Sequence, residues 1–286
     1  MQKIILYYKF VKIADTESVK LWQRELCERL GLKGRVLISS EGINGTLGGD
    51  YSALKLYKRA MSGHSLFTNI AYKWSDGSGD DFPRLSVKVR QETVTLGLPD
   101  ITPENCGQRL KPEEFHELVR NDPDVVLLDA RNNYESAIGK FKGAITPDIA
   151  NFRDLPGKIK DYEDLKDKKV VTYCTGGIRC ETLSALLKKE GFKRVYQLEG
   201  GIVKYGETYG DAGHWEGKCF VFDQRMSIGF SAQSTDIGEC VHCAAKTSNY
   251  LNCANKTCNK LILVCQTCRH QTTCGSDCQT ALPAVA

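Results

Sequence analysis

The segment from Val170 to Glu181, VVTYCTGGIRCE, constrains the fold of this chain more than any other. A short β-branched run ends at Cys174, a glycine-containing loop follows, and a helical pattern begins after the loop. A strand that passes through a tight loop into a helix places the cysteine at the helix N-terminus, where unpaired backbone N–H groups favour negative charge. We therefore expect Cys174 to have a lowered pKa and to react as a thiolate.

The loop is short, and its members are Cys174, Thr175, Gly176, Gly177, Ile178 and Arg179. Glycine lets the backbone curl around the sulfur, and the arginine adds a cation with a planar fork of donors. The ring is smaller than the phosphate-binding loop of tyrosine phosphatases, so it suits a sulfur atom or a persulfide better than a tetrahedral oxyanion. The alternative is a buried cysteine in a glycine-rich turn. The pattern C-x-x-G-x-R before a helix resembles the active loop of single-domain rhodanese sulfurtransferases.

The chain has 286 residues, 41% of them hydrophobic, which is enough for two or three domains with cores of their own. No apolar run approaches the roughly 20 residues that span a bilayer, so we expect no membrane partner. The N-terminal IILYYKFV is interrupted by Lys9 and is interpreted as a strand, not a signal peptide. The net charge of +4 is too small to prove a nucleic-acid partner. Because 13 cysteines occur without a secretory signal, we predict metal or redox chemistry in the reducing cytoplasm.

Residues 1–92 are predicted to form a ferredoxin-like (acylphosphatase-like) α+β domain, and residues 93–110 a linker. The expected order is β-α-β-β-α-β with an extra strand near the end. The expected elements are a strand Ile4–Val11, a helix capped by Asp15, a strand Arg35–Ser39, a turn Glu41–Gly45, a strand from Thr46, a helix Tyr51–Met61 capped by Asp50, and strands Ile70–Trp74 and Leu85–Arg90. The Glu41–Gly45 segment is either a plain hairpin turn or a loop that contacts a ligand. Basic residues here are expected on a solvated polar face, which could also contact phosphates: Lys33, Arg35, Lys73, Arg84, Lys88 and Arg90.

Residues 111–217 are predicted to form an α/β domain with a parallel sheet, because short buried strands alternate with helical patterns. Val125–Leu128 ends at Asp129, so Asp129 and Cys174 should share the C-terminal edge of the sheet. We interpret Asp129 as structural support that accepts backbone N–H groups or pairs with Arg131, or else as a plain strand-end cap. Cys180 is either a first-turn residue that points into the core or a thiol that attacks an oxidised or persulfidated Cys174.

Residues 218–286 carry cysteines in close pairs, after a strand signal around Phe220–Phe222. The pairs are Cys240 and Cys243, Cys253 and Cys258, Cys265 and Cys268, and Cys274 and Cys278. Four thiolates complete one tetrahedral zinc site, so the spacing predicts two structural Zn²⁺ sites. Either the first pair joins the second and the third the fourth, or the pairs interleave. The alternative is a disordered tail with free thiols.

Several strings in three separate parts of the chain resemble one subfamily of rhodanese-domain proteins, the bacterial tRNA uridine hydroxylases. They are VLISSEGINGTLGG (Val36–Gly49), FPRLSVKVR (Phe82–Arg90), DARNNYE, FKGAI, YCTGGIRCE, LEGGIVKYGE and CFVFDQR (Cys219–Arg225). Lys140 departs from the rhodanese pattern, which usually has histidine there. The resemblance implies tRNA as substrate, O2 as oxidant, 5-hydroxyuridine at the wobble position as product, and Cys174 as the catalytic, persulfide-bearing residue.

Two other functions remain open from the residues alone. The loop by itself favours a sulfurtransferase that moves sulfane sulfur through Cys174. A non-catalytic RNA- or protein-binding adaptor is the other alternative. Hydroxylation with O2 normally needs a redox centre, yet the sequence has neither a G-x-G-x-x-G fingerprint nor an obvious 2-His-1-carboxylate set. The electron donor and the oligomeric state are therefore left unassigned, and one hypothesis is that a sulfur species on Cys174 takes part in the oxidation.

Overall fold

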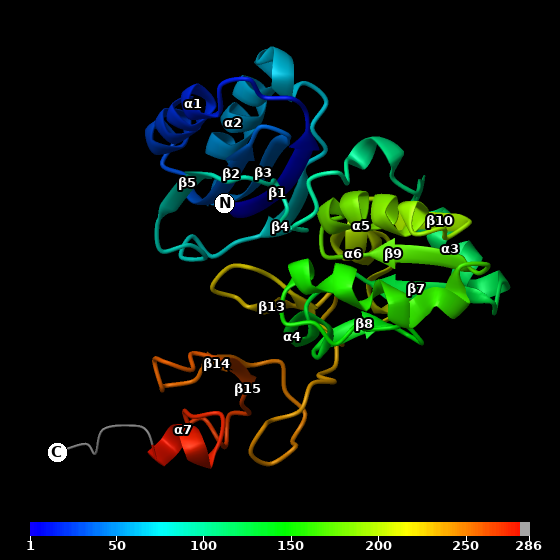
Figure 1. The fold of residues 1–286 in the computed structure, drawn as a ribbon. Coiled ribbons are helices and arrows are strands. Elements are labelled where there is room, and N and C mark those ends of the chain that lie inside the picture. The colour runs from blue at the N-terminus through cyan, green and yellow to red at the C-terminus, as the bar shows by residue number, and fades with distance from the viewer. Residues whose placement is uncertain (281–286) are drawn as a thin grey trace.

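The computed structural model describes residues 1–280, so the end of the predicted C-terminal region, 281–286, lies outside the described residues. Three parts follow one another along the chain (Figure 1). The N-terminal domain packs on the central domain, and the cysteine-rich segment comes last. No helix within residues 1–280 is long and apolar enough to cross a membrane.

The N-terminal domain is a five-stranded sheet with two helices on one face (Figure 1). Its elements are β1 (Gln2–Phe10), α1 (Thr16–Arg29), β2 (Lys33–Ser39), β3 (Gly42–Asp50), α2 (Tyr51–Gly63), η1 (Ser65–Phe67), β4 (Lys73–Asp76) and β5 (Leu85–Val89). The strand order β4-β1-β3-β2 is that of a ferredoxin-like sandwich, and β5 is the predicted extra strand, parallel to β2. The predicted fold of this part is therefore confirmed.

Several local predictions in this domain need correction, and one of them is the strand expected at Ile70–Trp74, which runs over Lys73–Asp76. Asp15 caps α1 as expected, because its carboxylate accepts the Ser18 N–H at 2.9 Å. Asp50 does not cap α2, since it ends β3 and its carboxylate faces the N-terminal ammonium group at 3.3 Å. Local sequence could not show this, because the competing partner, Met1, is 49 residues away in the chain.

The expected turn at Glu41–Gly45 is also shorter than predicted. Strand β3 already begins at Gly42 and pairs along its whole length with β1. Gly45 lies under the Tyr7 ring, where a Cβ would come within 2.3 Å of the ring. This glycine therefore permits a close cross-strand contact within the sheet, not a reversal of the chain.

The central domain contains a four-stranded parallel sheet in the order β6-β10-β9-β7. Its elements are η2 (Pro103–Asn105), β6 (Gln108–Leu110), α3 (Pro112–Asn121), β7 (Val125–Asp129), α4 (Asn133–Ser136), β8 (Gly139–Phe141), η3 (Phe152–Leu165), β9 (Lys169–Tyr173), α5 (Ile178–Lys189), β10 (Arg194–Leu198), α6 (Gly201–Tyr209), η4 (Gly210–Ala212) and β11 (Trp215–Gly217). Strand β6 belongs to this sheet although it falls in the segment predicted as a linker. Because β7 and β9 are neighbours, Asp129 and Cys174 come to the same edge, as expected.

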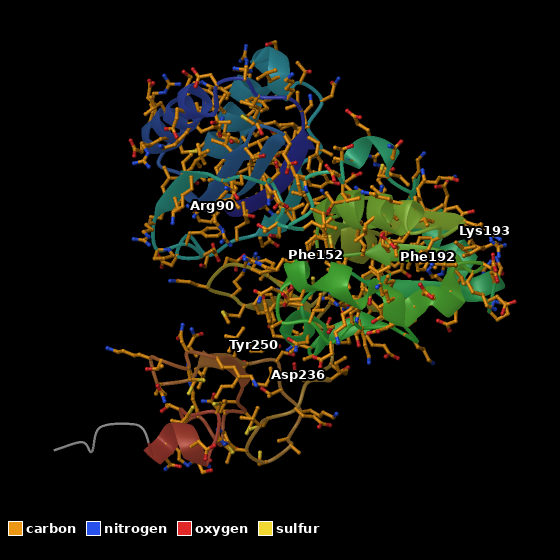
Figure 2. The ribbon with its side chains drawn as sticks, in the orientation of Figure 1. Arg90, Phe152, Phe192, Lys193, Asp236 and Tyr250 are labelled. Carbon is orange, nitrogen blue, oxygen red and sulfur yellow. The ribbon has the colours of Figure 1, made fainter. Side chains whose placement is uncertain are left out.

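The C-terminal segment has little regular structure. It contains β12 (Cys219–Phe220), β13 (Ser227–Ile228), β14 (Tyr250–Asn252), β15 (Leu261–Leu263) and α7 (Ser276–Thr280). Strand β12 thus covers only the start of the predicted Phe220–Phe222 strand. Tyr250, labelled in Figure 2, anchors the segment to the central domain, because its hydroxyl donates to the Tyr134 carbonyl. Within the segment its ring packs edge-on against Phe220.

Candidate active site at Cys174

Cys174 lies directly after β9 and before the first turn of α5, and its side chain is fully buried. The Gly177 N–H donates to Cys174 Sγ at 3.1 Å. Gly177 has a φ of +98°, a left-handed conformation that glycine adopts without Cβ strain. The loop therefore folds as the strand-loop-helix pattern predicts, with backbone donors aimed at the sulfur.

The second glycine-rich motif, LEGGI, holds this loop from the other side. At the start of α6, the Ile202 N–H donates to the Cys174 carbonyl at 2.9 Å and the Val203 N–H donates to the Thr175 carbonyl at 3.1 Å. A Cβ on Gly201 would lie 2.4 Å from the Cys174 carbonyl oxygen. Two helix N-termini thus meet at the loop, one donating to the sulfur and the other to the backbone behind it.

The surroundings of Cys174 lower the pKa of its thiol to about 5. Burial alone would raise this pKa, but it is outweighed by a hydrogen bond from Cys180, the Arg179 charge and the N–H groups of Arg179 and Gly177. Burial and the neighbouring Cys174 raise the pKa of Cys180, so Cys180 keeps its proton and donates it. Cys180 is thus both a buried first-turn residue and a direct neighbour of the reactive sulfur, a geometry compatible with both interpretations of its role.

Arg179 is not a free cation, contrary to the simplest reading of the loop. Its Nη1 and Nη2 bind the two carboxylate oxygens of Glu135 at 2.5 and 2.7 Å. Glu135 is fully buried, and although burial raises its pKa, the charge and hydrogen bonds of Arg179 bring it below the ordinary value. Thr175 Oγ1 lies 3.4 Å from both partners. The sequence places Glu135 in the D-x-R…Y-E motif but does not show that it binds Arg179.

The predicted pairing of Asp129 with Arg131 is confirmed. Arg131 Nη2 lies 2.6 Å from Asp129 Oδ2, and its Nε lies 2.9 Å from Oδ1. Both side chains are fully buried. Arg131 also donates to the carbonyls of Gly139 at 2.7 Å and Glu135 at 3.2 Å, so the pair ties the end of β7 to α4 and β8.

The N-terminal domain covers the Cys174 loop with the face of its sheet that lacks helices. The Tyr8 hydroxyl donates to Glu181 Oε1 at 3.0 Å, and Leu6 lies over Gly176. Glu181 is buried and also pairs with Arg109 at 2.8 Å. The sequence contains a signal for this contact, because the run IILYY puts apolar side chains on both faces of β1 and so indicates that both are covered.

Lys73 is the residue that sequence reasoning placed wrongly. It was expected on the solvated basic face, but it is only 7% exposed, and its Nζ lies 4.7 Å from the centre of the Tyr8 ring. Burial lowers the pKa of Lys73 to about 8, although the negative charges of Cys174 and Glu181 act to raise it. Arg35, Lys88 and Arg90 stay exposed, as expected.

A cavity of about 230 Å³ lies between the loop and strands β1, β2 and β3; we call it the Cys174 cavity. Its residues are Leu6, Tyr8, Arg35, Leu37, Asn44, Thr46, Val94, Cys174, Thr175, Gly176, Ile178, Arg179 and Phe222. Within residues 1–280, the side chains of Asn44 and Arg35 have no hydrogen-bond partner. The cavity thus offers apolar walls, free polar groups and one nucleophilic sulfur.

The lowered pKa of Cys174 predicts its reactivity toward iodoacetamide in the native protein. The alkylation rate should be flat above about pH 6 and fall about tenfold per pH unit below about pH 5, because only the thiolate reacts. Peptide mass spectrometry can follow Cys174 separately from Cys106, a half-buried cysteine whose pKa is raised and whose rate should still increase above pH 8. A Cys174 profile that parallels that of Cys106 would contradict the thiolate.

The eight C-terminal cysteines form two clusters in which the ligand atoms lie within 4.8 Å of one another. The clusters are Cys240, Cys243, Cys265 and Cys268, and Cys253, Cys258, Cys274 and Cys278. The pairs therefore interleave, which the sequence left open. Sγ–Sγ distances of 3.6 Å between Cys243 and Cys265 and 3.7 Å between Cys258 and Cys274 match the edge of about 3.8 Å in a tetrahedron with Zn–S bonds of about 2.3 Å. His242 is outside both sets and bonds to the Gln271 carbonyl.

Comparison with known proteins agrees with this architecture. Residues 2–93 match the UPF0176 acylphosphatase-like domain, residues 111–208 the rhodanese-like domain and residues 216–279 the rhodanese C-terminal domain. A tRNA uridine(34) hydroxylase from Arthrobacter sp. (strain FB24) is 51% identical over 264 residues, which cover 88% of this chain and 89% of that protein. A protein of the same name from Corynebacterium jeikeium (strain K411) is 52% identical over 259 residues, covering 87% and 84%.

Proposed function

Since the chain belongs to the tRNA uridine(34) hydroxylase family, we propose that it converts the wobble uridine of tRNA to 5-hydroxyuridine with O2, and that Cys174 carries the reaction. The observation that supports this most directly is the Cys174 cavity, where a thiolate held between two helix N-termini faces the sheet of another domain. The loop residues from Thr175 to Arg179 would hold the sulfur anion. Asp129 and Arg131 would support the loop from behind.

The size and lining of the cavity support a single pyrimidine base as its occupant. A volume of 230 Å³ holds about eight waters, and uracil has as many non-hydrogen atoms. The Asn44 amide carries both a donor and an acceptor, which complement the N3–H and carbonyl groups of uracil. Arg35, which is exposed at the cavity, is placed to bind a phosphate or ribose oxygen. An anticodon base can enter such a cavity without melting a duplex, because it is already in a single-stranded loop.

The overall reaction inserts one atom of O2 between C5 and its hydrogen, and the other atom leaves as water with two electrons and two protons from a reductant. The residues of this chain would bind and orient the base beside the Cys174 sulfur, present as a thiolate or as a persulfide. Cys180 and the Gly177 N–H would stabilise the negative charge on that sulfur. Tyr8, Leu6 and the rest of the N-terminal sheet would exclude bulk water.

A sulfurtransferase is the second candidate, and the rhodanese-like match of residues 111–208 favours it. In that function Cys174 would accept sulfane sulfur from a donor and pass it to an acceptor. The same Cys174 thiolate could serve both reactions. The two functions would therefore differ in the substrate that the cavity binds and not in the structure of the loop.

We also propose that each four-cysteine cluster holds one structural Zn²⁺, bound by thiolates alone. The tight grouping of the sulfurs and the small apolar core of this segment support a metal-stapled module. Because reduced thiols and tRNA occur together in the cytoplasm, we place the protein there.

Mass spectrometry of tRNA nucleosides after reaction with heavy-isotope O2 tests the proposed function. The purified protein with tRNA and a reductant should give 5-hydroxyuridine that carries label from O2 and none from labelled water. In the same assay Asn44→Ala should raise KM for tRNA by roughly tenfold, because the N3–H and carbonyl groups of the uracil lose the Asn44 amide as their hydrogen-bond partner. Asn105→Ala, an exposed asparagine outside the cavity, is the matched control.

Two results would count against the hydroxylase. Transfer of sulfur from thiosulfate with the appearance of thiolated nucleosides, and no hydroxylated product, would favour the sulfurtransferase. Salt-sensitive tRNA binding with no turnover of either kind would favour a binding adaptor.

A further inference from the structure

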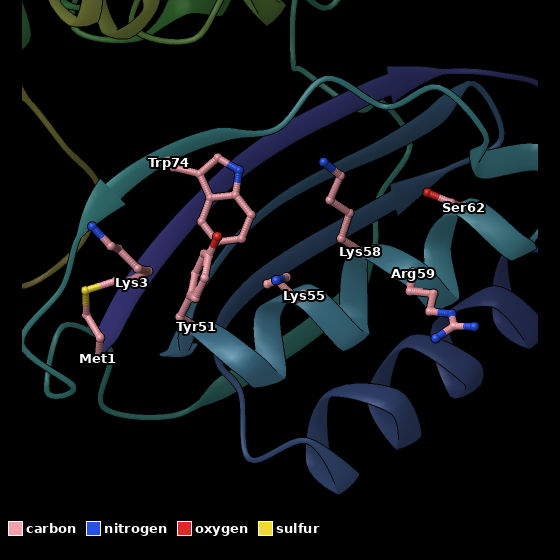
Figure 3. Close-up of a pocket in the computed structure, with 8 residues that line it drawn as sticks. All are labelled: Met1, Lys3, Tyr51, Lys55, Lys58, Arg59, Ser62 and Trp74. Carbon is pink, nitrogen blue, oxygen red and sulfur yellow. The ribbon is translucent and has the colours of Figure 1, made fainter.

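A second hollow lies on the helix-covered face of the N-terminal sheet, at its β4 edge (Figure 3). This hollow, which we call the α2–β4 groove, has a volume of about 730 Å³, more than three times that of the Cys174 cavity. Its charged and aromatic lining residues are Lys3, Tyr51, Lys55, Lys58, Arg59 and Trp74. In the close-up, the rings of Tyr51 and Trp74 lie between Lys3 on one side and the cations of α2 on the other (Figure 3).

The groove has an excess of positive charge that the protein itself does not neutralise. Lys55, Lys58 and Arg59 are exposed, and none of them forms an ion pair within residues 1–280. The nearby carboxylates are already engaged, because Asp76 pairs with Lys3 and Asp50 with the N-terminal ammonium group. Lys58 and Arg59 lie three and four residues after Lys55, so each neighbours Lys55 along α2, about 5–6 Å away at Cβ. The side chains of Lys58 and Arg59 diverge from each other (Figure 3).

Aromatic rings adjoin these cations. The Tyr51 and Trp74 rings meet edge to face with centroids 5.4 Å apart, and Tyr51 is 40% exposed. Lys55 Nζ lies 5.3 Å from the centre of the Tyr51 ring. Proteins bind single-stranded nucleic acid with cations along its phosphate backbone and with aromatic rings that stack against its bases or riboses. The groove offers both kinds of side chain. An acidic peptide would use the same cations but would gain less from the exposed aromatic ring.

Strand β4 lies between the groove and the reactive site. Side chains alternate between the two faces of a strand, so Trp74 lies on the helix face while Lys73 lies on the opposite face, over Tyr8. On that other face Arg225 donates to Ser75 Oγ and to the Asp76 carbonyl, and Lys73 is buried. The groove and the Cys174 cavity are therefore two separate surfaces on opposite faces of the same sheet.

We propose that the α2–β4 groove binds tRNA outside the Cys174 cavity, with Lys55, Lys58 and Arg59 on its phosphates and Tyr51 with Trp74 against a base or ribose. The proposal rests on the proposed function, because it takes tRNA as the substrate. It adds a second contact region, which supplies affinity while the cavity selects the base.

Binding of tRNA as a function of salt tests this groove. The triple variant Lys55→Gln, Lys58→Gln, Arg59→Gln should raise Kd by roughly tenfold or more at 0.15 M salt and make the slope of log Kd against log salt less steep by about 2 to 3. At saturating tRNA its kcat should equal that of the wild type, since the groove does not touch the reacting base. Arg153→Gln, Lys158→Gln, Lys160→Gln on η3 changes exposed residues of the same types and is the matched control.

The outcomes separate the groove from the proposed function. An unchanged Kd and salt slope in the triple variant would overturn the groove, as would an equal loss in the η3 control, which would reflect net charge alone. If the wild type binds tRNA without hydroxylating it, and the triple variant binds tRNA more weakly than the wild type, the groove stands and the hydroxylase is refuted. Thermal denaturation verifies that the triple variant is folded. The single variant Lys55→Glu, which reverses one exposed charge, should also raise the Kd for tRNA.

Discussion

Cys174→Ser should reduce the rate of tRNA hydroxylation by at least about 1,000-fold while the protein stays folded and binds tRNA. The loop is built to stabilise a sulfur anion, with a thiol pKa of about 5, whereas a serine hydroxyl in the same nest remains neutral. Serine also cannot carry a persulfide. Quantification of 5-hydroxyuridine in tRNA under single-turnover conditions gives the measurement.

Cys106→Ser is the control for this variant, because Cys106 is a half-buried cysteine outside the loop and both metal clusters. It should leave the rate within about twofold of the wild type. If Cys174→Ser retained most of the activity, Cys174 would not be the catalytic residue, and the cavity would have to act through its remaining side chains.

Removal of the two proposed Zn²⁺ ions should unfold the C-terminal segment, the largest stability effect that we expect in this protein. Structural Zn²⁺ contributes about 10–16 kcal/mol of apparent binding free energy at neutral pH, whereas the apolar core of this segment consists of a few residues around Ile262 and Val264. Elemental analysis should find two Zn²⁺ per chain, one for each cluster. Cys265→Ser should reduce this to one, and hydrogen exchange should then show loss of protection around β14 and β15.

Because the pairs interleave, Cys265→Ser should empty the cluster that contains Cys240 and leave the cluster of Cys253 intact. The Cys106→Ser protein, with its clusters untouched, should keep the full metal content. A wild-type protein that contains no zinc when purified under reducing conditions, yet shows the same protection from exchange, would contradict the metal sites.

The sequence predicted the site best where neighbouring residues make it. The nest at Cys174 needs only a strand, Gly177 and the first turn of α5, all within a few residues of one another. The pairing of Asp129 with Arg131 is equally local, because two residues separated by one position can share a hydrogen-bonded turn. The ferredoxin-like order of the first domain followed from periodicity, which is again a property of short segments.

Glycines and cations were harder to interpret, because their role depends on what packs against them. Gly45 suggested a turn, but it makes room for Tyr7 on the neighbouring strand. Lys73 suggested a solvated face, but it is covered when the two domains meet. Neither contact can be predicted from the residues next to Gly45 or Lys73 in the sequence.

By itself, then, the amino-acid sequence determined the classes of the domains and singled out the candidate reactive cysteine and the candidate metal ligands, since periodicity, loop spacing and cysteine pairs are local properties. Only the tertiary structure decided that Glu135 pairs with Arg179, that the cysteine pairs interleave, and that the N-terminal sheet closes a cavity over Cys174. Each of these depends on contacts between residues far apart in the chain, and their energies come from burial and charge pairing that exist only when the segments are brought together.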